Sequence, residues 1–172
     1  MSNVILITSS KNEIGKSVIA LKAAVEFSEN NVKTVVVDLS SGVRSIAEYA
    51  EVEEQIIYDV QDVIEETCSS EQATIEVESD LHILPSPRIK DKLSIVEEKQ
   101  FNKLILELRN KYDCIIVDSP VIFNQGFIGY ESVDCVLIID DSNITSIRNT
   151  YKIFNLFKRN TKKKTYMIIN KY

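Results

Sequence analysis

The feature that most constrains the fold is a series of short, continuous apolar runs separated by longer amphipathic stretches. Continuous apolarity without alternation is typical of strands buried on both faces, as in a parallel sheet covered by helices. The runs are Val4–Ile7, Val35–Val37, Leu81–Leu84, Ile115–Val117, Val136–Ile139 and Met167–Ile169. Helical patterns lie between them, at residues 16–28, 43–49, 58–66, 94–111 and 145–159. This alternation predicts an α/β fold with a doubly wound, mostly parallel sheet flanked by helices and connected by right-handed crossovers.

The length of 172 residues suits one compact domain, which we expect to span residues 1–172. The formal net charge of −6 argues against a general nucleic-acid-binding protein. The dense basic run Lys162–Lys164 is interpreted as a solvated turn. Three widely spaced cysteines without a CxxC pattern favour a reducing, cytoplasmic location, and neither a signal peptide nor a membrane span is evident. Residues 67–80 are expected to be irregular, and His82 is expected to be a core or edge residue of a strand.

A loop rich in polar residues follows the first predicted strand and precedes a predicted helix. Its sequence runs from Ser9 to Ser17 and ends in Gly15, Lys16 and Ser17. Strand, loop, Gly-Lys-Ser and helix form the context of a Walker A loop, in which backbone N–H groups and a helix N-terminus surround phosphates. Lys16 is expected to neutralise the β and γ phosphates, and the Ser17 hydroxyl to ligate Mg²⁺.

Two other predicted strands end in an acid, which is the pattern of a Walker B strand. Asp118 follows Ile115–Val117 and is expected to hold a Mg²⁺-bound water, and Asp38 follows Val35–Val37. A turn or capping carboxylate after a core strand is the alternative. Together with the Gly-Lys-Ser loop, these strands favour a P-loop NTPase fold.

The loop resembles that of the deviant Walker A ATPases of the MinD/ParA family, and within it the MinD branch. Lys11 matches the signature lysine of that family, Gly15 to Ser17 match the end of its loop, and Asp38 matches the first acid of its second-strand motif. Matching segments continue along almost the whole chain, at residues 57–65, 80–86, 88–92, 118–120, 124–127 and 146–148.

The resemblance implies a function and a set of site residues. It implies an ATP- and Mg²⁺-dependent dimer that positions division, partition or other cellular machinery. Lys11 and Asp38 would be catalytic, with Lys11 reaching the partner's phosphate across a nucleotide-sandwich dimer. Lys11, Gly15, Lys16, Ser17 and Asn170 would bind the nucleotide, with Asn170 near the adenine. Ser17 and Asp118 would serve the metal.

The sequence departs from the family pattern in the expected active site. Ser10, Asn12 and Glu13 stand where the family has glycines, whose left-handed backbone a glutamate adopts poorly. Ser40 replaces the second acid of the Asp-x-Asp motif, and Val18 replaces a second hydroxyl residue. Two hypotheses follow: an ATPase with weakened or absent hydrolysis, or a pseudo-ATPase scaffold that pairs with an intact MinD-like paralogue or another protein.

The family also continues beyond the length of this sequence. Its members add further helices after the strand that carries Asn170 and end in an amphipathic membrane-targeting helix. We therefore expect this chain to lack the C-terminal helices of the family and to contain no membrane-targeting helix. A homodimer or a heterodimer with a paralogue is the expected assembly.

Overall fold

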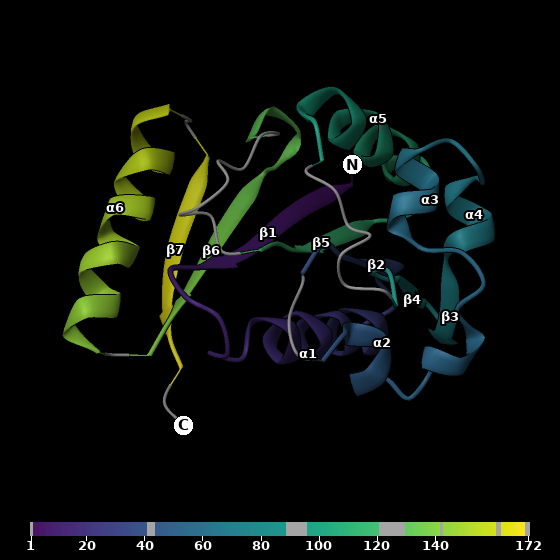
Figure 1. Cartoon of the computed structure of the whole chain (residues 1–172), viewed down its shortest axis with the longest axis horizontal. Helices are drawn as coiled ribbons and strands as arrows, with labels where there is room; N and C mark the ends of the chain where they lie inside the picture. Colours follow the sequence, from purple (N-terminus) through teal and green to yellow (C-terminus); the bar gives the residue numbers. More distant parts are fainter. Residues whose placement is uncertain are drawn as a thin grey trace.

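The computed structural model describes residues 2–40, 44–88, 96–120, 130–141, 143–160 and 163–170. Their strands form one seven-stranded sheet in the order β3-β4-β2-β5-β1-β6-β7 (Figure 1). The strands are β1 (Asn3–Ser9), β2 (Thr34–Asp38), β3 (Ile75–Glu78), β4 (Leu81–Leu84), β5 (Cys114–Asp118), β6 (Cys135–Asp140) and β7 (Lys164–Ile169). The α-helices are α1 (Lys16–Glu29), α2 (Ile46–Tyr49), α3 (Val60–Ile64), α4 (Ser70–Ala73), α5 (Glu98–Arg109) and α6 (Ile144–Asn160), with 3₁₀ turns η1 (Glu53–Gln55) and η4 (Tyr130–Ser132).

Every strand pair in the sheet is parallel except β3 with β4. The central strand β1 lies between β5 and β6, and β5 in turn pairs with β2. The register places Asp38 at the end of β2 directly beside Asp118 at the end of β5. Ligands of such sheets bind at the carboxyl ends of the strands, so the loops after β1, β2 and β5 meet where a site is expected.

Helices cover the two faces of the sheet (Figure 1). One apolar cluster contains Phe101, Leu104 and Leu108 of α5 together with Phe157 of α6. The other lies against the opposite face and contains Ala20 and Ala24 of α1 with Ile46 and Ala47 of α2. Side chains of neighbouring sheet residues alternate between the two clusters, which explains why the strands are apolar at every position.

The predicted fold class is confirmed, with every predicted strand present. The helices differ from prediction mainly at their ends. Helix α5 begins at Glu98, after a capping box between Glu97 and Gln100. Helix α2 begins at Ile46, because the hydroxyl of the N-cap Ser45 accepts a hydrogen bond from the N–H of Glu48. Residues 43, 94 and 95 of the predicted helices lie outside the described residues.

The expectation that residues 67–80 are irregular is wrong. A capping box between Ser69 and Gln72 begins α4, and the antiparallel edge strand β3 follows it. The alternation Ile-Glu-Val-Glu in β3 gives one apolar face, with Ile75 buried and Glu76 exposed. The half-buried His82 lies in β4 as expected, with its ring edge-on to Tyr112 at 5.2 Å. In the part of the chain that the structure describes, no helix is long and apolar enough to cross a membrane.

Candidate functional site

The loop between β1 and α1 ends in a glycine whose backbone is left-handed. Gly15 has φ 83° and ψ 18° and is the N-cap of α1. No side chain accepts a capping hydrogen bond there, and the first turn of the helix contains no acidic residue. The first N–H groups of a helix have no intrahelical partner, so this N-terminus can receive an anion such as a phosphate.

Glu13 adopts the left-handed backbone conformation that, from the sequence, we expected a glutamate to adopt poorly. Its φ of 59° lies in the region that glycine occupies without cost and other residues occupy at a penalty. The loop therefore keeps a backbone shape that suits glycine, although a glutamate stands at this position.

The structure brings the predicted Walker A and Walker B residues together. The Ser17 Oγ donates a hydrogen bond to Asp118 Oδ2 at 2.5 Å. Lys16 is buried, and burial lowers the pKa of its ammonium while the charges of Asp118 and Asp38 act in the opposite direction. Burial, followed by the charge of Asp38, raises the pKa of Asp118 to about 7. These groups form one buried polar centre behind the N-terminus of α1.

Each carboxylate oxygen of Asp38 accepts two hydrogen bonds. Its Oδ1 accepts from the N–H and the hydroxyl of Ser40 at 2.9 and 2.8 Å. Its Oδ2 accepts from the N–H of Ile46 and from the hydroxyl of Ser86, both at 3.0 Å. Burial raises the pKa of Asp38, and these donors partly offset that effect. Asp38 therefore ties the segment after β2, the start of α2 and the loop after β4 to one carboxylate.

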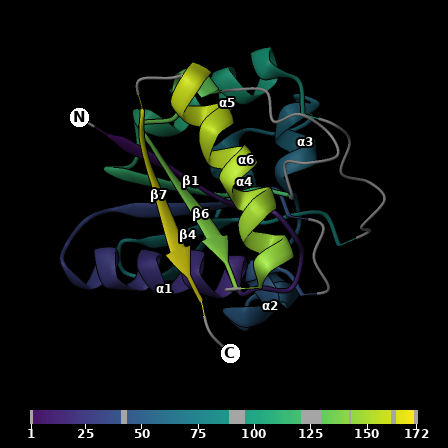
Figure 2. The same ribbon diagram turned by 90° about the vertical axis from the view of Figure 1, so that its left-hand side faces the viewer.

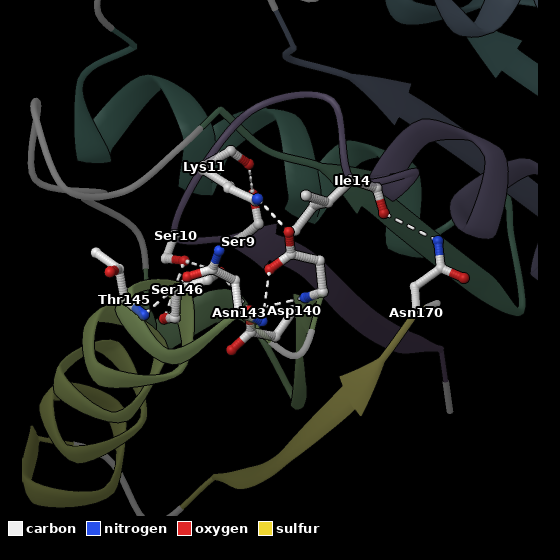
Figure 3. Close-up of polar contacts among 10 residues, drawn as sticks. Ser9, Ser10, Lys11, Ile14, Asp140, Asn143, Thr145, Ser146 and Asn170 are labelled. Carbon is white, nitrogen blue, oxygen red and sulfur yellow. Dashed lines mark hydrogen bonds and ion pairs between the residues drawn. The ribbon is translucent and has the colours of Figure 1, made fainter. Parts of the chain in front are cut away.

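Lys11 lies apart from this centre. Its ammonium forms an ion pair with Asp141, which follows β6 (Figure 3). The Lys11 side chain is 44% exposed, and its hydrogen bond holds the pKa of Asp141 below the usual range. The signature-lysine position thus has an intramolecular carboxylate partner.

Asn170 reaches the loop from the end of β7 (Figure 3). Its side-chain amide donates to the carbonyl of Ile14 at 3.0 Å, and its N–H donates to the carbonyl of Asp140 at 2.7 Å. The structure therefore places Asn170 beside the loop, where it fixes the backbone just before Gly15.

The sequence interpretation missed a further acid at the same edge. Asp140 is buried at the end of β6, and its Oδ1 accepts from the Ser146 hydroxyl and from the N–H of Asp141 (Figure 3). The Ser10 hydroxyl, one of the glycine replacements, lies 3.2 Å from that of Ser146. The signal that identified Asp38 and Asp118, an apolar strand ending in an acid, also marks Asp140. Nothing local in the sequence marks Ser86 or Ser146.

The donor set fits a magnesium nucleotide. Asp118 Oδ1 is buried and has no hydrogen-bond partner among the described residues, and the Ser17 hydroxyl is bonded to its other oxygen. Hydroxyl and carboxylate oxygens are the ligands that Mg²⁺ prefers, and a lysine beside a helix N-terminus complements phosphate charge. Ser17 and Asp118 could thus hold the metal and Lys16 the phosphates.

Comparisons with known proteins agree with this fold. The AAA_31 family model, described as an AAA domain, matches residues 2–169. The septum site-determining protein MinD of Helicobacter pylori is 32% identical over 181 residues, and its Bacillus subtilis counterpart is 26% identical over 163. MinD in the MinC:MinD cell division complex of Aquifex aeolicus superposes with a TM-score of 0.87 at 27% identity.

These relatives are longer than this chain. The matches cover 99%, 92% and 98% of the chain but only 67%, 60% and 68% of the H. pylori, B. subtilis and A. aeolicus proteins. The family model thus extends over Lys11, Lys16, Asp38 and Asp118 and ends one residue before Asn170. The chain spans about two thirds of the length of these relatives.

Proposed function

Because the chain belongs to the MinD/ParA family of P-loop ATPases, we propose that it is an ATP-binding switch in spatial positioning, with weakened or absent hydrolysis. The assembly that it positions would be a division site, a partition complex or a similar cytoplasmic assembly. The observation that carries the proposal is the buried contact of Ser17 with Asp118, next to Lys16 and behind the left-handed Gly15.

Each residue of the buried centre has a distinct part in binding. The N–H groups at the start of α1 receive phosphate oxygens, and Lys16 neutralises their charge without the competition of bulk water. Bound Mg²⁺ supplies charge neutralisation at the phosphates. The Ser17 hydroxyl and the Asp118 carboxylate would hold it. Asn170 fixes the loop through the carbonyl of Ile14, and we propose that it also contacts the base.

We expect weak hydrolysis because, of the two acids that would position the attacking water, one is held by other residues and the other is replaced by a serine. Asp38 uses both carboxylate oxygens to hold Ser40, Ile46 and Ser86. Ser40, at the second-acid position, donates to Asp38 and offers no carboxylate of its own. Catalysis in such sites depends on positioned charge, so loss of one acid lowers turnover more than it lowers binding.

We propose that residues 1–172 form one domain. The active assembly is a dimer, either of two copies of this chain or of this chain with a MinD-like paralogue. Lys11 acts in trans there, and it must first leave Asp141. Solvent screens a surface ion pair, so this contact contributes little and a second polyphosphate can displace it.

Calorimetric titration with ATP and Mg²⁺ tests the proposal. The wild-type chain should bind saturably, and Lys16→Ala should abolish binding because the buried ammonium is lost. Lys22→Ala removes an exposed lysine of the same helix and is the matched control. Equal binding by both variants, or none by the wild type, would contradict the nucleotide proposal.

A pseudo-ATPase scaffold is the second candidate, and the Ser40–Asp38 contact favours it. Combining Asn12→Gly, Glu13→Gly and Ser40→Asp restores the family pattern in the loop and at the second acid. Appearance of ATP turnover in this variant, measured as phosphate release, would show that only these positions block hydrolysis. A variant that binds ATP but stays inactive would favour the scaffold.

A further inference from the structure

The loop between β1 and α1 is fastened from outside at three of its residues. All three partners belong to the neighbouring part of the chain formed by β6, α6 and β7, and the pairs are Ser10 with Ser146, Lys11 with Asp141, and Ile14 with Asn170. Figure 2 shows the ends of β6 and β7 and the start of α6 at one end of the molecule. Because β6 is parallel to both β1 and β7, this is also the end at which the loop after β1 begins.

The contact of Ser10 with Ser146 has a buried carboxylate behind it. Ser146 Oγ donates its single proton to Asp140 Oδ1, so in its contact with Ser10 it can only accept. Ser10 Oγ, which lies 3.2 Å from Ser146 Oγ and 3.4 Å from the Ser146 carbonyl oxygen, is then the donor. Asp140 and Ser146 are both buried, so bulk water competes little with these bonds. Asp140 thus orients the Ser146 hydroxyl toward the loop.

Two regular elements hold this pair of residues in place. The side-chain oxygen of Asn143 accepts from the N–H of Thr145, and its carbonyl accepts from the N–H of Ile147, so the first turn of α6 is capped. Asp140 ends β6, which pairs with β1 on one side and β7 on the other. Ser146 therefore presents its hydroxyl to the loop from a fixed position.

The loop needs such support because its own backbone is strained. Glu13 has φ 59°, in the left-handed region that a residue with a Cβ atom occupies at a cost. Strained backbone of this kind persists only where the surrounding structure holds it. The contacts of Ser10 and Ile14 fix the loop on both sides of Glu13. A glycine at position 10 has no hydroxyl and could not make the first of them.

We propose that Ser146, oriented by Asp140, is a positioning residue for the nucleotide: through Ser10 it holds the loop in its phosphate-binding conformation before the nucleotide arrives. A ligand that binds one loop conformation has an apparent affinity reduced by the fraction of molecules that adopt it. The contact raises that fraction and thereby the affinity for ATP. The inference rests on the proposed nucleotide site and adds to it a residue from outside the loop.

The three contacts differ in what they can contribute. The ion pair of Lys11 with Asp141 is partly exposed, and it breaks when Lys11 acts across the proposed dimer. Asn170 fixes the other end of the loop and is the residue that we propose to contact the base. The Ser146 contact is buried on the Ser146 side and can persist in every nucleotide state, so it suits a permanent positioning role.

Calorimetric titration with ATP and Mg²⁺ measures the effect on affinity. Ser146→Ala should raise the Kd about fivefold, the effect of one hydrogen bond of ordinary strength. Thr145→Ala removes an exposed hydroxyl from the same turn of α6 and should leave the Kd unchanged. Thermal unfolding checks that each variant folds. If Ser146→Ala does not fold, Ser10→Ala takes its place, because it leaves the bond from Ser146 to Asp140 intact.

A double-mutant cycle separates positioning through Ser10 from a general structural role of Ser146. Ser10→Ala should raise the Kd about fivefold, and the double variant should raise it no further, because both changes remove the same contact. Independent effects would instead multiply, to about 25-fold in the double variant.

A second measurement reports on the loop without nucleotide. Nitrogen-15 relaxation of the labelled chain gives backbone order parameters, which we expect near ~0.85 for residues 11–15 in the wild type. In Ser146→Ala they should fall below about 0.6, the value typical of flexible backbone, while those of α5 stay unchanged.

Together the two measurements distinguish failure of this inference from failure of the nucleotide site. ATP binding by the wild type, with either the Kd or the order parameters unchanged in Ser146→Ala, would overturn the positioning role alone. Multiplying effects in the cycle would overturn it as well. No ATP binding by the wild type, with order parameters that still fall in Ser146→Ala, would contradict the nucleotide site and support the role of Ser146 in holding the loop.

Discussion

At the scale of single residues, the loop before α1 combines a backbone shaped for glycine with a side chain that opposes it. Glu13 has φ 59°, one residue before the buried Ile14. A left-handed backbone costs a residue other than glycine about 1–2 kcal/mol. Glycine avoids this cost, but it loses about 0.5–1 kcal/mol more conformational entropy on folding, which offsets part of the gain. The strain is therefore local and measurable.

Glu13→Gly should raise the free energy of unfolding by about 0.5–1 kcal/mol, because the left-handed penalty disappears. Urea unfolding measures the change, and Glu13→Ala, which removes the carboxylate but keeps Cβ, is the control. Equal stabilisation by alanine would assign the effect to charge and contradict the backbone explanation.

Asp118 makes the stability of the chain depend on pH. Burial raises its pKa from 3.8 to about 7, so between these values the folded chain holds a proton that the unfolded chain has released. Stability from this group is complete below about pH 4 and is lost as the pH rises to about 7. The Asp118→Asn variant has no titrating carboxyl group at this position, so it does not lose stability in this way as the pH rises.

The free energy of unfolding of Asp118→Asn, relative to wild type, should thus increase by up to about 1.4 kcal/mol per pH unit across that window and level off above it. Urea unfolding at pH 5, 6, 7 and 8, without nucleotide or Mg²⁺, measures this difference, with the exposed Asp113→Asn as control. A difference that does not change with pH would sink this account.

The sequence could predict contacts among residues that belong to a recognisable motif or end an apolar strand. Gly15, Lys16 and Ser17 are adjacent, and Asp118 ends an apolar strand, so their meeting with each other follows from the fold class. The partners of Asp38 come from three separate segments, and Lys11 pairs with an acid 130 positions away. Such contacts depend on loop conformations that no local pattern specifies.

At the scale of elements, one carboxylate joins several loops. Asp38 at the end of β2 accepts from the N–H of Ile46, the first residue of α2, and from Ser86 after β4. A four-residue helix has few hydrogen bonds of its own, so α2 depends on this anchor.

Ser86→Ala removes one donor from this anchor and should lower the free energy of unfolding by about 1 kcal/mol. Hydrogen exchange at the N–H of Ile46 should also accelerate, because its acceptor is less well held. Ser28→Ala is the control, since that buried hydroxyl bonds only within α1. Unchanged exchange at Ile46, or equal acceleration in the control, would rule out the anchor.

Element types were predicted better than element ends. Strands buried on both faces give continuous apolar runs that sequence identifies directly. The helix starts depend on caps such as Ser45 and Glu97. Strand β3 was missed because apolar residues alternate with glutamates in it and form no continuous apolar run. Helix α4 was missed because Ala73 is its only apolar residue, which leaves no helical pattern to recognise.

At the scale of the whole molecule, the sheet order determines which loops meet at the carboxyl ends of the strands. Placing β1 between β5 and β6 brings the loop after β1 beside Asp118 on one side and Asp140 on the other. Strand β7, next to β6, brings Asn170 to the same loop, where its side-chain amide donates to the carbonyl of Ile14 and its N–H donates to that of Asp140.

The central claim is that this fold binds a magnesium nucleotide at the N-terminus of α1. The most direct measurement is an amide nuclear magnetic resonance map of the labelled chain, recorded during titration with ATP and Mg²⁺. We predict the largest shifts at Gly15, Lys16 and Ser17, smaller ones at Asp38 and Asp118, and none of this in Lys16→Ala. Saturating ATP that leaves these amides unshifted, or shifts confined to α5 and β3, would contradict it.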